Sequence, residues 1–135
     1  MTRTAIIAAL PGELKPFVRG WQTESCNGIH LWRCQLDQHE WVAGCAGAGQ
    51  AAATRAFAEL ERDGPIDQVV SAGWAGALSD EFTVGLAYWV RGVIDARTGE
   101  RFAASEPVVA TKSEEVLSHP SDRNKDVARV GHPGW

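Results

Sequence analysis

Short apolar segments, each stopped by glycine or proline, alternate with amphipathic stretches over the first hundred residues. Residues 4–10 are continuously apolar and are followed by Pro11-Gly12. Such a run is typical of a strand buried on both faces of a parallel sheet. Pro11 suits the first turn of a helix, and Glu13 would lie in that turn, so we predict a helix that ends by Gly20. Three apolar residues of this helix are expected to face the core: Leu14, Phe17 and Val18.

Two extended segments and a longer helix come next. Residues 28–34 alternate in polarity and residues 41–45 form a second extended run, so we predict antiparallel strands joined by a turn at Asp37-Gln38. From residue 50 to residue 62 the apolar positions follow a helical period, and Gly64-Pro65 ends the helix. The apolar residues at this period are expected to face the core: Ala53, Ala56, Phe57 and Leu60.

Two further strands are predicted before the composition changes. Residues 68–71 form a strand that ends in a loop of small residues around Trp74. Residues 86–94 form another strand with a kink at Gly92, followed by a polar turn at residues 95–100. Beyond residue 104 the apolar residues are few and scattered. We therefore predict one domain part over residues 1–104 and a polar tail, disordered or loosely packed, over residues 105–135.

Composition limits the class of protein. A chain of 135 residues with a net charge of −4 suits one globular domain, and it contains no cluster of Lys and Arg that would bind nucleic acid. The three cysteines lack a CxxC spacing, and no histidine pair has a metal-ligand spacing, so we expect reduced thiols and no metal site. The first apolar run is too short to span a membrane, and no signal peptide precedes it. We expect a cytoplasmic protein that does not associate with membranes.

Glycine-rich loops follow two of the predicted strands, at residues 44–49 and 73–76. Glycine allows a backbone to approach a ligand closely, and two such loops with a helix between them indicate the ligand edge of an open α/β sheet. Residues 47–52 also match the dinucleotide motif G-x-G-x-x-A, but Asp67 precedes the next strand instead of ending it, which disfavours a dinucleotide. A phosphate or sugar near Gly49 and a purely structural tight turn both remain open.

Glu13 is the candidate catalytic residue. It follows a buried strand and begins a helix, so its carboxylate would stand at the ligand edge and could act as a general base toward water. The alternative is that Glu13 only interacts favourably with the helix dipole.

Three blocks in this order resemble the nucleoside phosphorylase/nucleosidase superfamily, and the nearest branch is the methylthioadenosine/S-adenosylhomocysteine nucleosidases. The blocks are IIAALPGEL at residues 6–14, GAGQAAA at residues 47–53 and VSAGWAGAL at residues 70–78, and the resemblance extends over residues 4 to about 102. It implies a three-layer α/β/α sandwich around a mixed sheet. It also implies hydrolysis of the N-ribosidic bond of a purine nucleoside by a homo-oligomer, without metal or cofactor.

The resemblance also assigns roles to individual residues. Glu13 matches the glutamate that positions and deprotonates the attacking water. The substrate-binding positions by resemblance are Ala9, Gly47, Ala48, Trp74, Ala75 and Gly76. Trp74 stands where the family commonly has a small residue, so its ring is expected to narrow the pocket or to change the base preference. The phosphorylase branches of the family have a phosphate-binding arginine in the loops that match Pro11-Gly12 and residues 44–49. Neither loop contains an arginine here, which favours water as the nucleophile.

The sequence also departs from the family pattern. The family's Met-Glu pair for the ribose hydroxyls and its Ser-Asp pair for protonation of the purine have no match here. Glu114-Glu115 and Ser121-Asp122 resemble these pairs only by chance, because neither has the strand context. We therefore expect the N-terminal part of such an enzyme, truncated at its C-terminal side and impaired in catalysis. A non-catalytic nucleoside-binding or structural remnant is the alternative.

Overall fold

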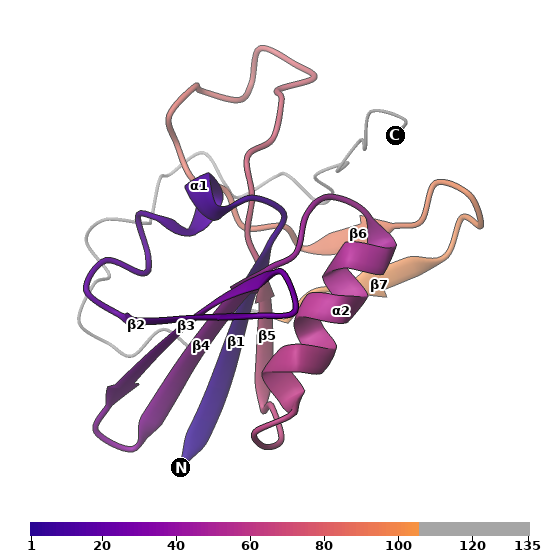
Figure 1. The fold of residues 1–135 in the computed structure, drawn as a ribbon. Helices are drawn as coiled ribbons and strands as arrows, with labels where there is room; N and C mark the ends of the chain where they lie inside the picture. Colours follow the sequence, from indigo (N-terminus) through magenta and orange to yellow (C-terminus); the bar gives the residue numbers. More distant parts are fainter. Residues whose placement is uncertain (106–135) are drawn as a thin grey trace. The chain divides into compact units, whose positions relative to one another are not determined.

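The computed structural model describes residues 1–105, which fall into two units, Met1–Trp74 and a second that begins at Ala75 (Figure 1). The two units are treated separately below. The first contains one sheet and two helices. Its elements, in chain order, are β1 (Thr2–Ala8), α1 (Pro11–Leu14), β2 (Gln22–Cys26), β3 (Ile29–Leu36), β4 (His39–Cys45), α2 (Gln50–Glu61) and β5 (Gln68–Ser71).

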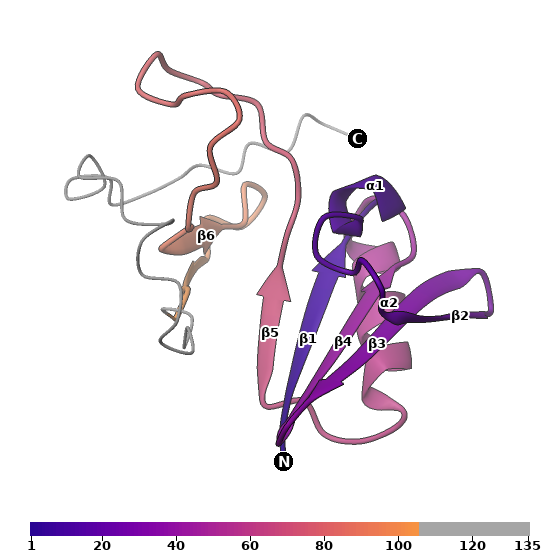
Figure 2. The same ribbon diagram turned by 90° about the vertical axis from the view of Figure 1, so that its left-hand side faces the viewer.

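The sheet of the first unit is mixed, with the strand order β2-β3-β4-β1-β5. β1 is parallel to both β4 and β5, whereas β3 is antiparallel to β4 and to β2. Figure 2 shows the three parallel strands side by side, with α1 beyond the carboxyl end of β1. The helix α2 connects β4 to β5, which are parallel strands on either side of β1 and therefore need a crossover connection.

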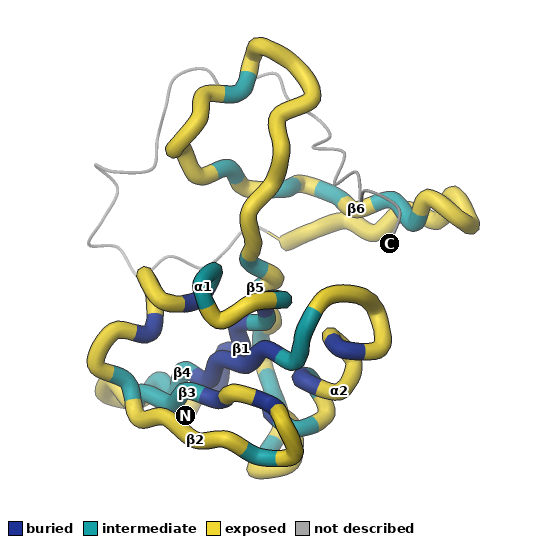
Figure 3. The backbone as a smooth tube through the Cα atoms, turned by 45° about the horizontal axis from the view of Figure 1, so that its top comes forward, coloured by how far each residue is buried: buried dark blue, intermediate teal, exposed yellow. Residues whose placement is uncertain are grey.

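Both faces of this sheet are covered. On one face Leu60 of α2 packs in a buried cluster with residues of β1, β3 and β4: Ala5, Ile29, Leu31 and Val42. On the other face Leu14 and Val18 pack against Ile6, Ala43 and Cys45. Successive residues of a strand point to opposite faces, so the apolar run of β1 serves both clusters. Figure 3 shows the buried backbone concentrated along β1 and its neighbours. The predicted α/β fold with a mixed sheet is confirmed.

Most of the predicted elements of the first unit are present. The parallel strand β1, the β3–β4 hairpin with its turn at Asp37, the helix α2 and the strand β5 all form, and Asp37 takes the left-handed conformation of a tight turn with φ 53°. The edge strand β2 was not predicted. Four of its five residues are exposed, so no alternation of apolar and polar residues marks it.

Three details of the helix predictions were wrong. The first helix covers only Pro11–Leu14 and continues as turns, with main-chain bonds from Phe17 and Val18 to the Leu14 carbonyl. Phe17 is 55% exposed instead of facing the core. In α2, Ala52 is buried and Ala53 is exposed, so the inward face is displaced by one residue at the start of the helix.

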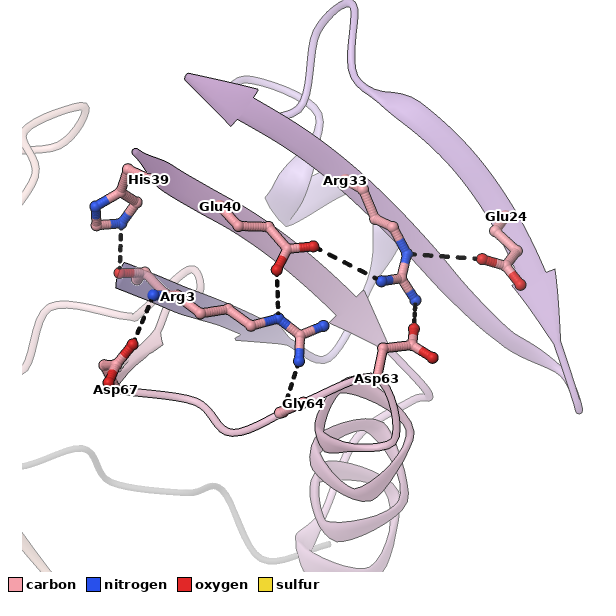
Figure 4. A network of polar contacts seen from close by, with 9 residues as sticks. Arg3, Glu24, Arg33, His39, Glu40, Asp63, Gly64 and Asp67 are labelled. Carbon is pink, nitrogen blue, oxygen red and sulfur yellow. Dashed lines mark hydrogen bonds and ion pairs between the residues drawn. The ribbon is translucent and has the colours of Figure 1, made fainter. Parts of the chain in front are cut away.

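A polar network joins the amino ends of the parallel strands to the end of α2 (Figure 4). Arg3 of β1 is buried, and its guanidinium lies 2.8 Å from Glu40 and donates to the Gly64 carbonyl at 2.6 Å. Arg33 of β3 contacts Glu40 and also pairs with Asp63. These contacts connect β1, β3, β4 and the segment after α2, so the network joins segments far apart in the sequence at the amino edge of the sheet.

The second unit has less regular structure. It contains β6 (Gly92–Ile94) and β7 (Arg101–Ala103), which form a two-stranded antiparallel sheet. The predicted strand over residues 86–94 is wrong except for its last three residues. Before them the chain turns, with a bond from the Leu86 N–H to the Thr83 carbonyl, and residues 86–91 pair with no described strand. The predicted polar turn is confirmed, since the Asp95 N–H donates to the Glu100 carbonyl at 2.9 Å.

The division of the chain at residue 104 stays a prediction. The predicted tail, including Glu114-Glu115 and Ser121-Asp122, lies outside the described residues apart from Ser105. Within residues 1–105 no helix has the length and apolar character needed to cross a membrane.

Candidate functional site

The carboxyl ends of three parallel strands meet at one edge of the first unit. Ala8 of β1 is in register with Cys45 of β4, and Ile7 is in register with Ser71 of β5. The chain beyond each strand stays close to its neighbours, as the Gly47 N–H donates to the Ala9 carbonyl at 3.1 Å. Ligands of open α/β sheets commonly bind outside the carboxyl ends of the strands, so this edge is the candidate site.

Glu13 is fixed at this edge by three main-chain donors. Its Oε2 accepts hydrogen bonds from the N–H groups of Ala9 at 3.1 Å and Leu10 at 2.9 Å. Its Oε1 accepts the N–H of Trp74 at 3.1 Å. A carboxylate has about four acceptor positions, so one remains available. The carboxylate is therefore held in one orientation and can still accept a hydrogen bond from a water molecule.

Two glycines allow this close approach. A Cβ at Gly73 would lie 3.2 Å from Oε1 of Glu13, and a Cβ at Gly12 would lie 3.2 Å from the indole ring of Trp74. Both distances are shorter than ordinary van der Waals contact. The loop after β5 can therefore close on α1 only because both positions lack side chains.

Cys45 ends β4 beneath this edge and is buried. Burial, and secondarily the negative charge of Glu13, raise the pKa of the Cys45 thiol above its ordinary value. The thiol is thus neutral at physiological pH and behaves as a small apolar side chain in the core.

The loop after β4 provides the remaining part of the edge. Gly47 and Gly49 have φ of 109° and 94°, which favour glycine, and Ala48 between them is exposed. One cation lies near this loop. Arg55 of α2 is exposed, as its position in the helical pattern indicates, and it donates to the Ala46 carbonyl at 3.3 Å, a contact that the sequence did not predict.

Four of the residues predicted from the sequence are joined at one place by hydrogen bonds. Ala9 donates to Glu13 and accepts from Gly47, and Trp74 donates to Glu13. Ala48 follows Gly47 in the same loop. The other two predicted positions, Ala75 and Gly76, begin the second unit and are exposed. Their assignment to the site stays a prediction.

The part of the chain that the structure describes contains no group of three or more His, Cys, Asp or Glu side chains able to hold a metal ion. The candidate site therefore consists of one oriented carboxylate, main-chain groups and an exposed indole. In mixed α/β sheets of this kind, small molecules commonly bind between the loops at the carboxyl ends of the strands.

Solved structures of one kind of enzyme share this fold. The first is the 5′-methylthioadenosine/S-adenosylhomocysteine nucleosidase from S. pneumoniae with a transition-state inhibitor, MT-ImmA. It has a TM-score of 0.54 and 26% identity over 68% of this chain and 39% of that chain. The second is a mutant of MTAN from Helicobacter pylori with 5′-methylthioadenosine in its active site. It has a TM-score of 0.55 and 14% identity, and the match covers 82% of this chain and 51% of that chain.

No protein-family model matches the sequence, and no curated protein matches it. The resemblance to methylthioadenosine/S-adenosylhomocysteine nucleosidases that the sequence indicated is confirmed by the solved structures. The chain has a nucleosidase-like fold and spans between two-fifths and about half of the length of these enzymes.

Proposed function

We propose that this protein binds a purine nucleoside of the methylthioadenosine or S-adenosylhomocysteine type and hydrolyses its N-ribosidic bond. The observation that carries the proposal is the Glu13 carboxylate, held by three N–H groups at the carboxyl edge of the sheet with one acceptor position free. The fold of the similar nucleosidases and the order of the three sequence blocks support the same assignment.

In the proposed reaction Glu13 acts as the general base. A water molecule donates its proton to the carboxylate while the water oxygen bonds to C1′ of the ribose. The bond from C1′ to the purine nitrogen breaks, and its electron pair goes to the base, which then takes up a proton. By the resemblance, main-chain groups of Ala9, Gly47 and Ala48 are proposed to contact the ribose side, and Trp74 is proposed to influence the base preference.

No residue of the described part of the chain is assigned as the proton donor for the departing purine. A positioned general acid contributes about 10²–10⁴-fold to such a reaction. The sequence also lacks a match to the pair that would hold the ribose hydroxyls. We therefore expect slow turnover, and we expect a purine nucleoside rather than a phosphorylated ligand as the substrate.

Release of free adenine from methylthioadenosine, followed by chromatography, tests the proposal. We expect release by the full chain above the uncatalysed rate and a loss of about 100-fold or more in Glu13→Gln. Glu61→Gln is the matched control, because Glu61 is an exposed carboxylate at the end of α2. Release that persists in Glu13→Gln would contradict the role of Glu13. Release that requires phosphate and yields 5-methylthioribose 1-phosphate would contradict hydrolysis.

A second candidate is a nucleoside-binding protein without turnover. The observation that favours it is that both oxygens of Glu13 already accept main-chain hydrogen bonds, two of them from Ala9 and Leu10 in its own loop. A carboxylate whose only role is to stabilise a turn makes the same hydrogen bonds. Calorimetric titration with methylthioadenosine in the absence of adenine release would support this candidate.

A further inference from the structure

Trp74 contacts the candidate site through two separate parts of the residue. Its main-chain N–H donates to Oε1 of Glu13 at 3.1 Å. Its indole ring lies against Gly12, close enough that a Cβ on that glycine would be 3.2 Å from ring atom Cη2. Gly12 and Glu13 are neighbours in α1, so one residue of the loop after β5 contacts two consecutive residues of the helix.

The ring is otherwise exposed, with 73% of the residue accessible to solvent. A side chain of this size contributes little to a core from such a position, so packing of the core does not explain it. The ring nevertheless lies so close to Gly12 that an added Cβ would force the ring or the turn to shift by a few tenths of an ångström. This approach is a second connection, beside the hydrogen bond, between residue 74 and the turn that carries Glu13.

We propose that Trp74 is a positioning residue for Glu13: the indole, seated on Gly12, keeps the main-chain N–H of residue 74 bonded to the carboxylate. This inference rests on the proposed function in so far as Glu13 is the base. A hydrogen bond at the exposed end of a loop opens readily when nothing else holds the loop. The ring contact supplies that second attachment. It thereby helps to hold Oε1 of Glu13, the carboxylate oxygen that keeps a free acceptor position.

Amide hydrogen exchange of the full chain tests the proposal independently of turnover. In Trp74→Ala the N–H at position 74 is still present but its anchor is lost, so we expect its exchange to become about tenfold faster. Trp74→Phe keeps an aromatic ring but lacks the distal ring atoms that lie near Gly12, so we expect it to restore the protection only in part. Gly12→Ala adds a Cβ that would press against the ring, and we expect the same faster exchange at position 74 as in Trp74→Ala. The amides of β1, measured in the same samples, report whether each variant is folded.

Trp89→Ala is the matched control, because Trp89 is also exposed, at 56%, but belongs to the second unit. It is expected to leave exchange at position 74 unchanged. Unchanged exchange in folded Trp74→Ala or in folded Gly12→Ala would overturn the proposal.

Kinetics separate this inference from the proposed function. If methylthioadenosine is hydrolysed, a positioning role predicts that Trp74→Ala lowers kcat by about tenfold, whatever change in KM follows from the lost contact of the ring with the substrate. A rise in KM with unchanged kcat and unchanged exchange would instead mean that Trp74 only contacts the ligand, which contradicts the inference and leaves the function standing. If no hydrolysis occurs, the proposed function fails, and the exchange measurement still decides whether Trp74 positions Glu13.

Discussion

The main-chain N–H of Trp74 donates a 3.1 Å hydrogen bond to the carboxylate of Glu13, 61 residues earlier in the chain. This bond connects the loop after β5 to the first turn of α1, which follows β1. Because β1 and β5 are parallel neighbours, the two loops leave the sheet at the same edge. The carboxylate therefore joins two strand ends, and its removal is expected to affect both structure and chemistry.

Glu13→Ala is expected to lower the free energy of unfolding of the first unit by about 1–2 kcal/mol, because three N–H groups lose their acceptor. Glu13→Gln keeps one carbonyl oxygen and is expected to cost less. Denaturant unfolding followed by circular dichroism measures both. Equal stability of the wild type and Glu13→Ala would mean that water replaces the carboxylate without cost.

Gly73→Ala is expected to open the site while leaving the sheet intact. The added Cβ would lie 3.2 Å from Oε1 of Glu13, so either the loop or the carboxylate has to move. We expect faster amide exchange at Trp74 and slower adenine release, with a change in unfolding free energy of at most about 1 kcal/mol. Gly76→Ala is the control for the exchange measurement alone, since a Cβ there would meet no atom within 4 Å. Equal amide exchange at Trp74 in the two variants would contradict the close approach.

Stability is expected to fall at alkaline pH through Cys45. Its thiol has a raised pKa in the folded state, first through burial and then through Glu13, so the folded protein holds the thiol proton more strongly than the unfolded chain does. This contribution is complete below the ordinary pKa of 9.0 and is lost as the pH rises through the raised value. Cys45→Ala should reduce the fall in unfolding free energy above about pH 9, measured by denaturant titration, and Cys34→Ala should not.

Neighbouring alanines of α2 provide a test of its inward face. Ala52 is buried and Ala53 is exposed. Ala52→Leu is expected to overpack the interface with the sheet and to cost about 1–3 kcal/mol. Ala53→Leu should change the unfolding free energy by no more than about 0.5 kcal/mol. Thermal unfolding measures both variants. A larger loss of unfolding free energy in Ala53→Leu than in Ala52→Leu would contradict the inward orientation of Ala52.

Local patterns were sufficient to predict the framework of the first unit. β1 is identified by its continuous apolar run, because it is buried on both faces of the sheet. The β3–β4 hairpin is identified by alternating polarity around a turn, and α2 by a helical period, because each kind of burial requires a different spacing of apolar residues. Where the environment did not impose such a spacing, prediction failed. β2 is exposed along most of its length, and residues 86–91 contain many apolar residues yet pair with no described strand.

The sequence by itself determined the residue types of the candidate site: a carboxylate after the first buried strand and glycines after the next two parallel strands. The tertiary structure decided which of these groups meet. Strand register brings Ala9, Gly47, Trp74 and Glu13 together, and the bond between Trp74 and Glu13 spans 61 residues. No spacing along the chain encodes that contact, because it arises from the parallel pairing of β1 with β5, and pairing depends on side chains distributed over the whole sheet.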